Sequence, residues 1–98
     1  MSYNLFCETN KIIQWEHLNS RVQSFTTAEY VPMPGMGIDG GDALGISIPL
    51  KNTGVKAWKE INEIIKILQT EFNFVIYDMY YGELVELNNM EKIKEAIT

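Results

Sequence analysis

The chain has few of the residues on which disulfide, metal and histidine chemistry depend. Its 98 residues include one cysteine, Cys7, and one histidine, His17. A single cysteine excludes an internal disulfide framework and a Cys-x-x-Cys metal knuckle. On its expected helix His17 points away from the apolar stripe, and no Ser/His/Asp or Cys/His set has a spacing that would assemble it. We therefore expect a protein that is not an enzyme and that uses no metal or cofactor.

Basic residues are also scarce. The chain has 8 Lys and Arg against 13 Asp and Glu, which gives a formal net charge of −5. This balance disfavours nucleic acid as a partner, because nucleic-acid binding needs a basic footprint. Two long segments lack Lys and Arg, and within them lie the acidic stretches 29–42 and 71–91. If these stretches share one edge of the fold, the molecule has a negative side that would attract a basic partner.

Long apolar runs are absent as well. No run approaches the ~18 residues of a membrane-spanning helix. The segment Met1 to Asn4 lacks the positive charge that precedes the apolar core of a signal peptide. The apolar fraction of 46% and the charged fraction of 21% are ordinary for a globular protein. We expect a single cytoplasmic domain over residues 1–98 with no membrane partner.

The segment from Ala43 to Leu87 contains the strongest secondary-structure signals. Ala43 to Leu50 alternates between apolar and small residues, which predicts a strand whose small face would let a helix approach. An amphipathic helix is expected over Val55 to Phe72, with Asn52 or Thr53 as its N-cap. The helix carries one apolar stripe. It consists of Ala57, Trp58, Ile61, Ile64, Ile65, Leu68 and Phe72, with Ile67 outside it.

Two further strands follow this helix. Asn73 to Tyr77 is continuously apolar after the Asn, which is typical of a central strand covered on both faces. Gly82 can supply the positive φ of a tight turn. Glu83 to Leu87 then reads as the next strand.

The rest of the chain adds a strand, a helix, a second strand and a terminal helix. These elements are expected at Tyr3 to Cys7, Lys11 to Phe25, Ala28 to Val31 and Met90 to Ile97, with Asn88 or Asn89 capping the last helix. The order predicts a ferredoxin-like βαββαβ fold of the α+β class, with an added C-terminal strand and helix. If residues 26–33 form a loop, a smaller mixed sheet results.

A glycine-rich loop spans Pro34 to Asp42. Residues 35–40 match G-x-G-x-x-G, but a strand follows them where a dinucleotide site needs a helix, and aspartates would repel phosphate. Asp39 and Asp42 are too few for a metal site, so we expect solvated acids in a partner-contacting loop.

Tyrosines and acids gather after the strand that ends near Tyr77. Tyr80 and Tyr81 follow Asp78 closely, and tyrosine is enriched in protein interfaces. A carboxylate beside them can pair with Lys or Arg of a partner. The alternative is that Tyr77 lies in the core and the others line a turn.

The same region resembles a known family. In FVIYDMYYGELVEL, Tyr77-Asp78 ends one strand and Gly82-Glu83 begins the next. This strand–turn–strand segment resembles a signature of small acidic bacterial immunity proteins from toxin–immunity pairs. The resemblance implies a cytoplasmic protein that blocks a cognate toxin by binding it.

We therefore expect a protein-binding module of the immunity type that masks the basic site of a toxin. The expected partner-binding residues are Asp39, Asp42, Asp78, Tyr80, Tyr81, Glu83 and Glu86. One alternative is a small ligand-binding or enzymatic domain with residues 35–42 as a lid. The other is a homo-oligomer that pairs through an edge strand at 26–33 or 83–87.

Overall fold

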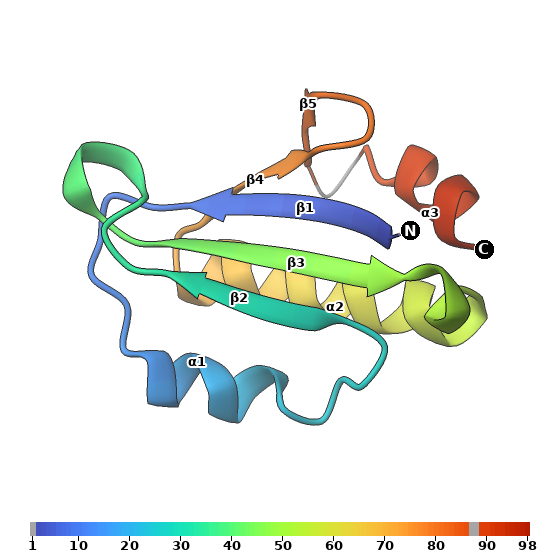
Figure 1. The fold of residues 1–98 in the computed structure, drawn as a ribbon, viewed down its shortest axis with the longest axis horizontal. Helices are drawn as coiled ribbons and strands as arrows, with labels where there is room; N and C mark the ends of the chain where they lie inside the picture. The colour runs from blue at the N-terminus through green and yellow to red at the C-terminus, as the bar shows by residue number, and fades with distance from the viewer. Residues whose placement is uncertain (1, 87–88) are drawn as a thin grey trace.

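The computed structural model describes residues 2–86 and 89–98. It contains one five-stranded antiparallel sheet with strand order β2-β3-β1-β4-β5, together with three α-helices (Figure 1). The α+β class expected from the sequence is confirmed. The elements are β1 (Ser2–Glu8), α1 (Trp15–Val22), β2 (Glu29–Met33), η1 (Ile38–Gly40), β3 (Ala43–Pro49), η2 (Leu50–Asn52), α2 (Val55–Glu71), β4 (Val75–Asp78), β5 (Glu83–Leu84) and α3 (Glu91–Ile97).

The first strand lies at the centre of the sheet. Leu5 of β1 is opposite Ile46 of β3 on one side and Asp78 of β4 on the other. The alternation along β1 turns Tyr3, Leu5 and Cys7 toward the helices, as the period-two pattern predicts. β2 and β5 form the two outer edges. Each of the two segments suspected as edges, 26–33 and 83–87, thus contains an outer strand. The strand predicted over Glu83 to Leu87 is shorter than expected, since β5 comprises only Glu83–Leu84, and Leu87 lies outside the described residues.

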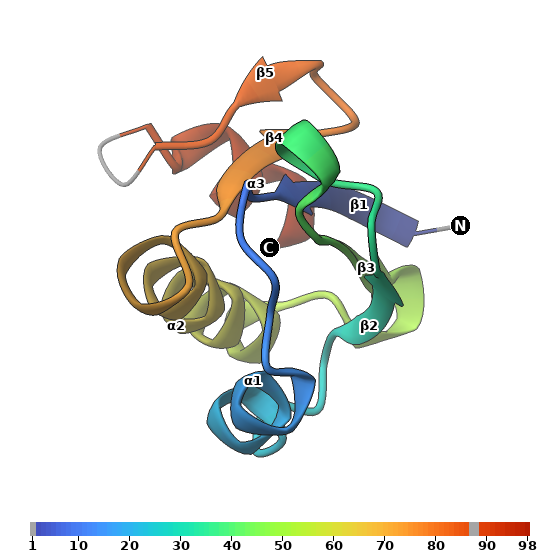
Figure 2. The ribbon, with the colours of Figure 1, turned by 90° about the vertical axis from the view of Figure 1, so that its left-hand side faces the viewer.

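The helices cover one face of the sheet and leave the other open (Figures 1 and 2). The core lies between the inward side chains of the strands and the apolar stripe of α2. Ile67 is also buried, so the buried surface of α2 is wider than the predicted stripe. At helical spacing Ile67 lies on the side of α2 that carries Glu60 and Glu71. The carboxylates of these two residues accept hydrogen bonds from Thr27 and Arg21, so the extra width faces α1 and the chain that follows it.

The N-cap predicted for α2 is wrong. The N-cap is Gly54, at φ 136°, and no side chain caps the helix. The backbone N–H of Gly54 donates instead to the carbonyl of Ile97, so the start of α2 is tied to the end of α3. Of the two cap candidates for α3, Asn88 lies outside the described residues, and the N-cap is Met90.

The first helix is shorter than the apolar periodicity predicts. It begins at Trp15 rather than Lys11, and its N-cap is Gln14. The preceding backbone is used elsewhere: the carbonyl of Lys11 accepts from the N–H of Asp42, and the N–H of Ile13 donates to the Asp42 carboxylate at 2.8 Å. These bonds to a distant loop replace the first helical turn.

The expectation that β4 is covered on both faces is wrong. Ile76 and Asp78 are buried, whereas Val75 and Tyr77 are half-buried on the open face. Gly45 and Ser47 likewise admit no helix. The methyl carbon of Met33 occupies the space over Gly45, 3.1 Å from where a Cβ would lie. A small residue therefore makes room for a side chain of the neighbouring strand.

Candidate protein-binding surface

The uncovered side of the sheet, called here the open face, consists of the strand side chains that point away from the helices. Strand pairing and alternation place the following residues on it. They are Asn4, Phe6, Glu8, Glu29, Val31, Met33, Gly45, Ser47, Val75, Tyr77 and Leu84. Most are apolar, and Val31 is 53% exposed and Leu84 44% exposed. Contiguous exposed apolar surface of this kind marks interaction sites in proteins.

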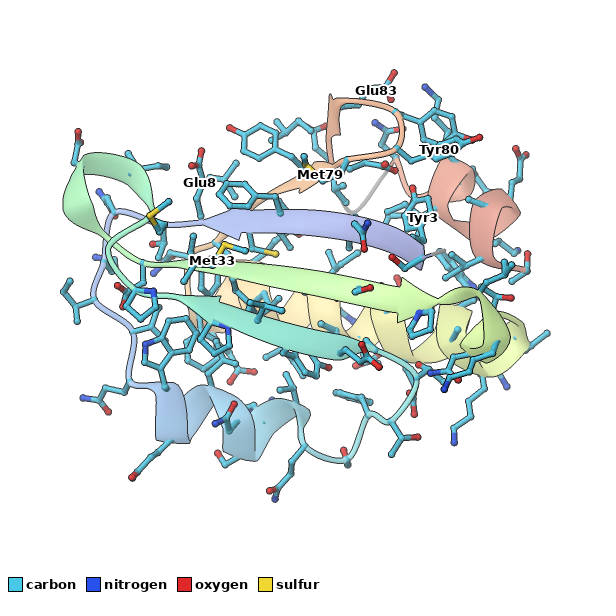
Figure 3. All side chains as sticks on the ribbon, in the orientation of Figure 1. Tyr3, Glu8, Met33, Met79, Tyr80 and Glu83 are labelled. Carbon is cyan, nitrogen blue, oxygen red and sulfur yellow. The ribbon has the colours of Figure 1, made fainter. Side chains whose placement is uncertain are left out.

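A shallow hollow of about 270 Å³ lies in the open face. Its side-chain walls come from β1, β2, β3 and the residue after β4. They are Asn4, Phe6, Val31, Met33, Ser47 and Met79. Met33 and Met79 are labelled over this face in Figure 3, and Met79 is 60% exposed. Methionine side chains are flexible and polarizable, so the hollow can adapt to an apolar group of a partner.

Charge is unevenly distributed between the strands and the rest of the chain. None of the eight Lys and Arg residues lies in any described strand. The strands do carry acids, and Glu8 and Glu29 stand on the open face beside its apolar residues. The basic residues lie on the helices and connections. The open face is therefore apolar and negative.

A second hollow, called here the tyrosine pocket, lies where β1 begins. Its volume is about 220 Å³, and its lining comes from β1, η2, the loop after β4 and α3. The lining residues are Ser2, Tyr3, Leu50, Thr53, Tyr80, Tyr81 and Ala96. Tyr80 is 73% exposed and Tyr81 40% exposed. Figure 3 shows Tyr3 and Tyr80 at this end of the molecule.

The buried Asp78 carboxylate fixes the positions of the three tyrosines that line the tyrosine pocket. Its carboxylate accepts hydrogen bonds from the hydroxyl of Tyr3 and from the backbone N–H groups of Tyr80, at 2.8 Å, and Tyr81, at 3.0 Å. Gly82 closes the turn at φ 70°, so the predicted positive φ is confirmed. Burial, followed by the hydrogen bond to Asp78, raises the pKa of Tyr3. Asp78 is 3% exposed and therefore shapes the loop rather than reaching toward a partner.

Asp42 is also an internal residue, and the expectation that it is a solvated loop acid is wrong. It is 3% exposed, and its carboxylate accepts from the N–H groups of Ile13, at 2.8 Å, and Gly35, at 2.9 Å. The loop it anchors is bound down, because the N–H of Ile38 donates to the carbonyl of Thr9 at 3.0 Å. A Cβ at Gly41 would overlap that same carbonyl. The glycines therefore permit close packing rather than lid motion.

The structure separates the remaining predicted partner residues. Glu83 and Glu86 are exposed, and Glu83 forms an ion pair at 2.7 Å with Lys92, which also lies over the ring of Tyr81. Asp39 is exposed in η1, next to the opposite end of β1. The idea that stretches 29–42 and 71–91 share one edge is wrong, because β2 and β5 are opposite edges. Of the two acids on the open face, Glu29 lies on the edge strand β2 and Glu8 on the central strand β1.

Possible metal-binding and nucleophilic side chains among the described residues include Cys7 and His17. Within 2–86 and 89–98, no group of three or more His, Cys, Asp or Glu side chains is placed to hold a metal ion. Cys7 is fully buried in β1, and burial raises the pKa of its thiol. His17 lies against Phe72, with 5.4 Å between ring centroids.

Of the described helices, none has both the length and the apolar character to cross a membrane.

Sequence reasoning missed the open face. The signal was present in the strands, whose alternate positions include Phe6, Val31, Met33 and Tyr77. Of these residues only Tyr77 was predicted to lie on a covered strand, and none was predicted to form an exposed apolar surface. Comparisons of the chain with protein-family models, with curated proteins and with solved structures found no match.

Proposed function

We propose that this chain is a non-catalytic protein-binding module of the immunity type, which neutralises a cognate bacterial toxin in the cytoplasm by masking its basic site. The observation that carries the proposal is the open face, where an apolar hollow lies beside Glu8 and Glu29 in a sheet without Lys or Arg. The matching partner presents an apolar group surrounded by basic residues. We also propose a ferredoxin-like assignment, supported by the order β2-β3-β1-β4.

The size of the hollows favours a protein partner over a small ligand. Pockets for drug-sized ligands occupy roughly 300–1,000 Å³ and bury most of the ligand. The hollows of about 270 and 220 Å³ are smaller and open. Aromatic residues and methionine are enriched in protein interfaces, and Phe6, Met33, Met79 and Tyr80 supply them here.

Charge favours a different protein over a second copy of this chain. Two open faces packed together would bring Glu8 and Glu29 near the same acids of the other copy, and like charges in an interface are unfavourable. A basic surface would instead be attracted, and the attraction would raise the association rate. Toward β5, beside the tyrosine pocket, the charge of Glu83 is balanced by its ion pair with Lys92, so the negative charge of the open face comes from Glu8 and Glu29.

The experiment is co-expression with the product of the neighbouring upstream gene in the native host genome. We expect that product to arrest growth when expressed alone, the present chain to restore growth, and the two to purify as a stoichiometric complex. An upstream product that is harmless, or that forms no complex, would contradict the immunity-type function.

The binding surface is tested by a charge-reversal pair. Glu29→Lys reverses a charge on the open face, whereas Glu63→Lys reverses an exposed charge on α2. We expect Glu29→Lys to slow association by about 10-fold at low salt and to reduce its salt dependence, with Glu63→Lys close to wild type. Equal association rates for both variants would rule out the open face as the docking surface.

A further inference from the structure

We infer, resting on the proposed function, that the tyrosine pocket binds a single cationic side chain, a Lys or Arg, of the protein partner. The inference starts from the arrangement of three rings. The ring centroids of Tyr3 and Tyr80 are 6.0 Å apart, and those of Tyr80 and Tyr81 are 4.9 Å apart with the planes at 81°. The planes of Tyr3 and Tyr80 are inclined by 30°, and Tyr80 and Tyr81 meet edge to face, so the rings that line the hollow differ in orientation. A cation over a ring face that they leave open is attracted by its negative π-system.

The pocket also has a buried negative charge behind it. The Asp78 carboxylate lies behind the Tyr3 hydroxyl, and the three donors that contact it are a phenol and two backbone amides. These groups are neutral, so they stabilise the carboxylate without cancelling its charge. In the low-dielectric surroundings of a buried group, this charge acts over a longer range than it would in water.

The chain already places one cation against this cluster. The Nζ of Lys92 lies 5.2 Å from the ring centroid of Tyr81, within cation–π range. Lys92 is held there by Glu83, whose two carboxylate oxygens accept from Nζ at 2.7 and 2.8 Å. The hydrogen bond to Glu83 raises the pKa of Lys92, so the ammonium is charged at neutral pH. A tyrosine of the pocket therefore already interacts with an ammonium group from its own protein.

The size and lining of the pocket specify the ligand as one long side chain. A volume of about 220 Å³ is below the roughly 300–1,000 Å³ of pockets for drug-sized ligands and is sufficient for the end of a Lys or Arg. Leu50, 65% exposed, and Ala96 provide apolar surface for the methylene stem. The hydroxyls of Ser2 and Thr53 can accept hydrogen bonds from the charged end.

The first test needs no partner. The probe is Nα-acetyl-lysine methylamide, compared with the uncharged Nα-acetyl-norleucine methylamide, by NMR titration of the tyrosine ring protons. We expect the lysine probe to shift the Tyr80 and Tyr81 ring signals with weak saturable binding and the norleucine probe to leave them in place. No shift with lysine, or equal shifts with both probes, would overturn the inference.

A matched pair of variants identifies the ring as the binding group. Tyr80 is 73% exposed, so neither Tyr80→Phe nor Tyr80→Leu removes core packing. Phenylalanine keeps the π-face and leucine does not. We expect Tyr80→Phe to bind the lysine probe nearly as wild type and Tyr80→Leu to bind it about 3- to 30-fold more weakly. Retention of full binding by Tyr80→Leu would overturn the inference.

The same pair separates this inference from the proposed function. In the toxin complex, Tyr80→Leu is expected to raise the dissociation constant about 3- to 30-fold, and Tyr80→Phe to leave it nearly unchanged. A complex that is sensitive to Glu29→Lys but not to Tyr80→Leu would overturn the pocket inference and leave the proposed function standing. Lysine-probe binding that follows the expected variant pattern, without any toxin complex, would support the pocket and reject the immunity function.

Discussion

The hydroxyl of Tyr3 donates a hydrogen bond to the carboxylate of Asp78, which joins residues 75 positions apart in the sequence. The bond ties the beginning of β1 to the end of β4, and both residues are buried. Because Asp78 also accepts from the Tyr80 and Tyr81 amides, the bond fixes the loop that presents these tyrosines. A buried hydrogen bond between two strands therefore fixes the position of the exposed loop that carries Tyr80 and Tyr81.

Removal of the Tyr3 hydroxyl is expected to destabilise the fold. Tyr3→Phe leaves the buried Asp78 carboxylate with one donor fewer, and we expect a loss of about 1–3 kcal/mol in the free energy of unfolding. The control is Tyr80→Phe, which removes a hydroxyl from a side chain that is 73% exposed and should change stability by less than about 0.5 kcal/mol. Urea denaturation measures both. Equal effects would contradict the role assigned to the Tyr3–Asp78 bond.

Replacement of each aspartate of the glycine-rich loop by asparagine is expected to change the free energy of unfolding by very different amounts. Asp42→Asn weakens two charge-assisted bonds, a buried one from the N–H of Ile13 and a part-buried one from the N–H of Gly35, so we expect a loss of about 2–3 kcal/mol. Asp39→Asn changes an exposed side chain at φ 50°, a conformation that asparagine tolerates, and should cost less than about 0.5 kcal/mol. Chemical denaturation of the two variants tests this contrast. A stable Asp42→Asn would show that the loop is not anchored through its carboxylate.

Glu60 is expected to make stability depend on pH. Its Oε1 accepts from the N–H of Thr26 at 3.0 Å and from the N–H and hydroxyl of Thr27 at 3.0 and 2.6 Å. Partial burial raises the pKa of Glu60, but the bonds from Thr27 outweigh it, and the pKa falls below its usual value. A lowered folded-state pKa stabilises the protein above the unfolded-state pKa, and this contribution disappears as pH falls through the folded-state value.

The test is the stability difference between wild type and Glu60→Gln across pH. We expect about 1 kcal/mol at pH 7, since the amide keeps an acceptor but loses the charge. The difference should shrink below about pH 4, near the ordinary range of a glutamate. Glu63→Gln, at an exposed position of the same helix, should show little difference at either pH. A stability difference between wild type and Glu60→Gln that stays constant down to pH 3 would contradict a contribution from hydrogen bonds to the charged Glu60 carboxylate.

Cys7 is expected to report global unfolding. Its side chain is fully buried and burial raises the pKa of its thiol, so neither access nor thiolate is available in the folded protein. We expect a thiol reagent to label the native protein on the order of 10³-fold more slowly than the denatured chain, because labelling requires opening of the core. Rapid labelling at low denaturant would reveal local opening of β1 instead.

The sequence predicted the elements where one periodic pattern dominates. The stripe of α2 and the alternation of Leu44, Ile46 and Ile48 in β3 give helix and strand at the expected places. The start of α1 was misplaced because apolar spacing continues through Ile12, while the backbone there bonds to Asp42. Ile12 is 77% exposed as a result. Local periodicity contains no information about such distant bonds.

Of the residues predicted to contact a partner, Tyr80 and Tyr81 are exposed, whereas Asp42 and Asp78 are buried. Acidic residues are rarely fully buried, so Asp42 and Asp78 were expected at the surface. Their partners, Tyr3 and Ile13, lie far away in the sequence. The open face was missed for a related reason, since alternation identifies two faces of a strand without indicating which one a helix covers.

The central position of β1 has a consequence for how the protein is made. β1 leaves the ribosome first, but its neighbours β3 and β4 begin only at Ala43 and Val75. Both edges of β1 remain unpaired until β3 has been translated and one edge until β4 has been translated, a condition that favours aggregation and chaperone capture. The sheet can be completed only after the residues of β4 and β5 have been synthesised. Its long-range pairings lead us to expect slower refolding than in a helical bundle of this length.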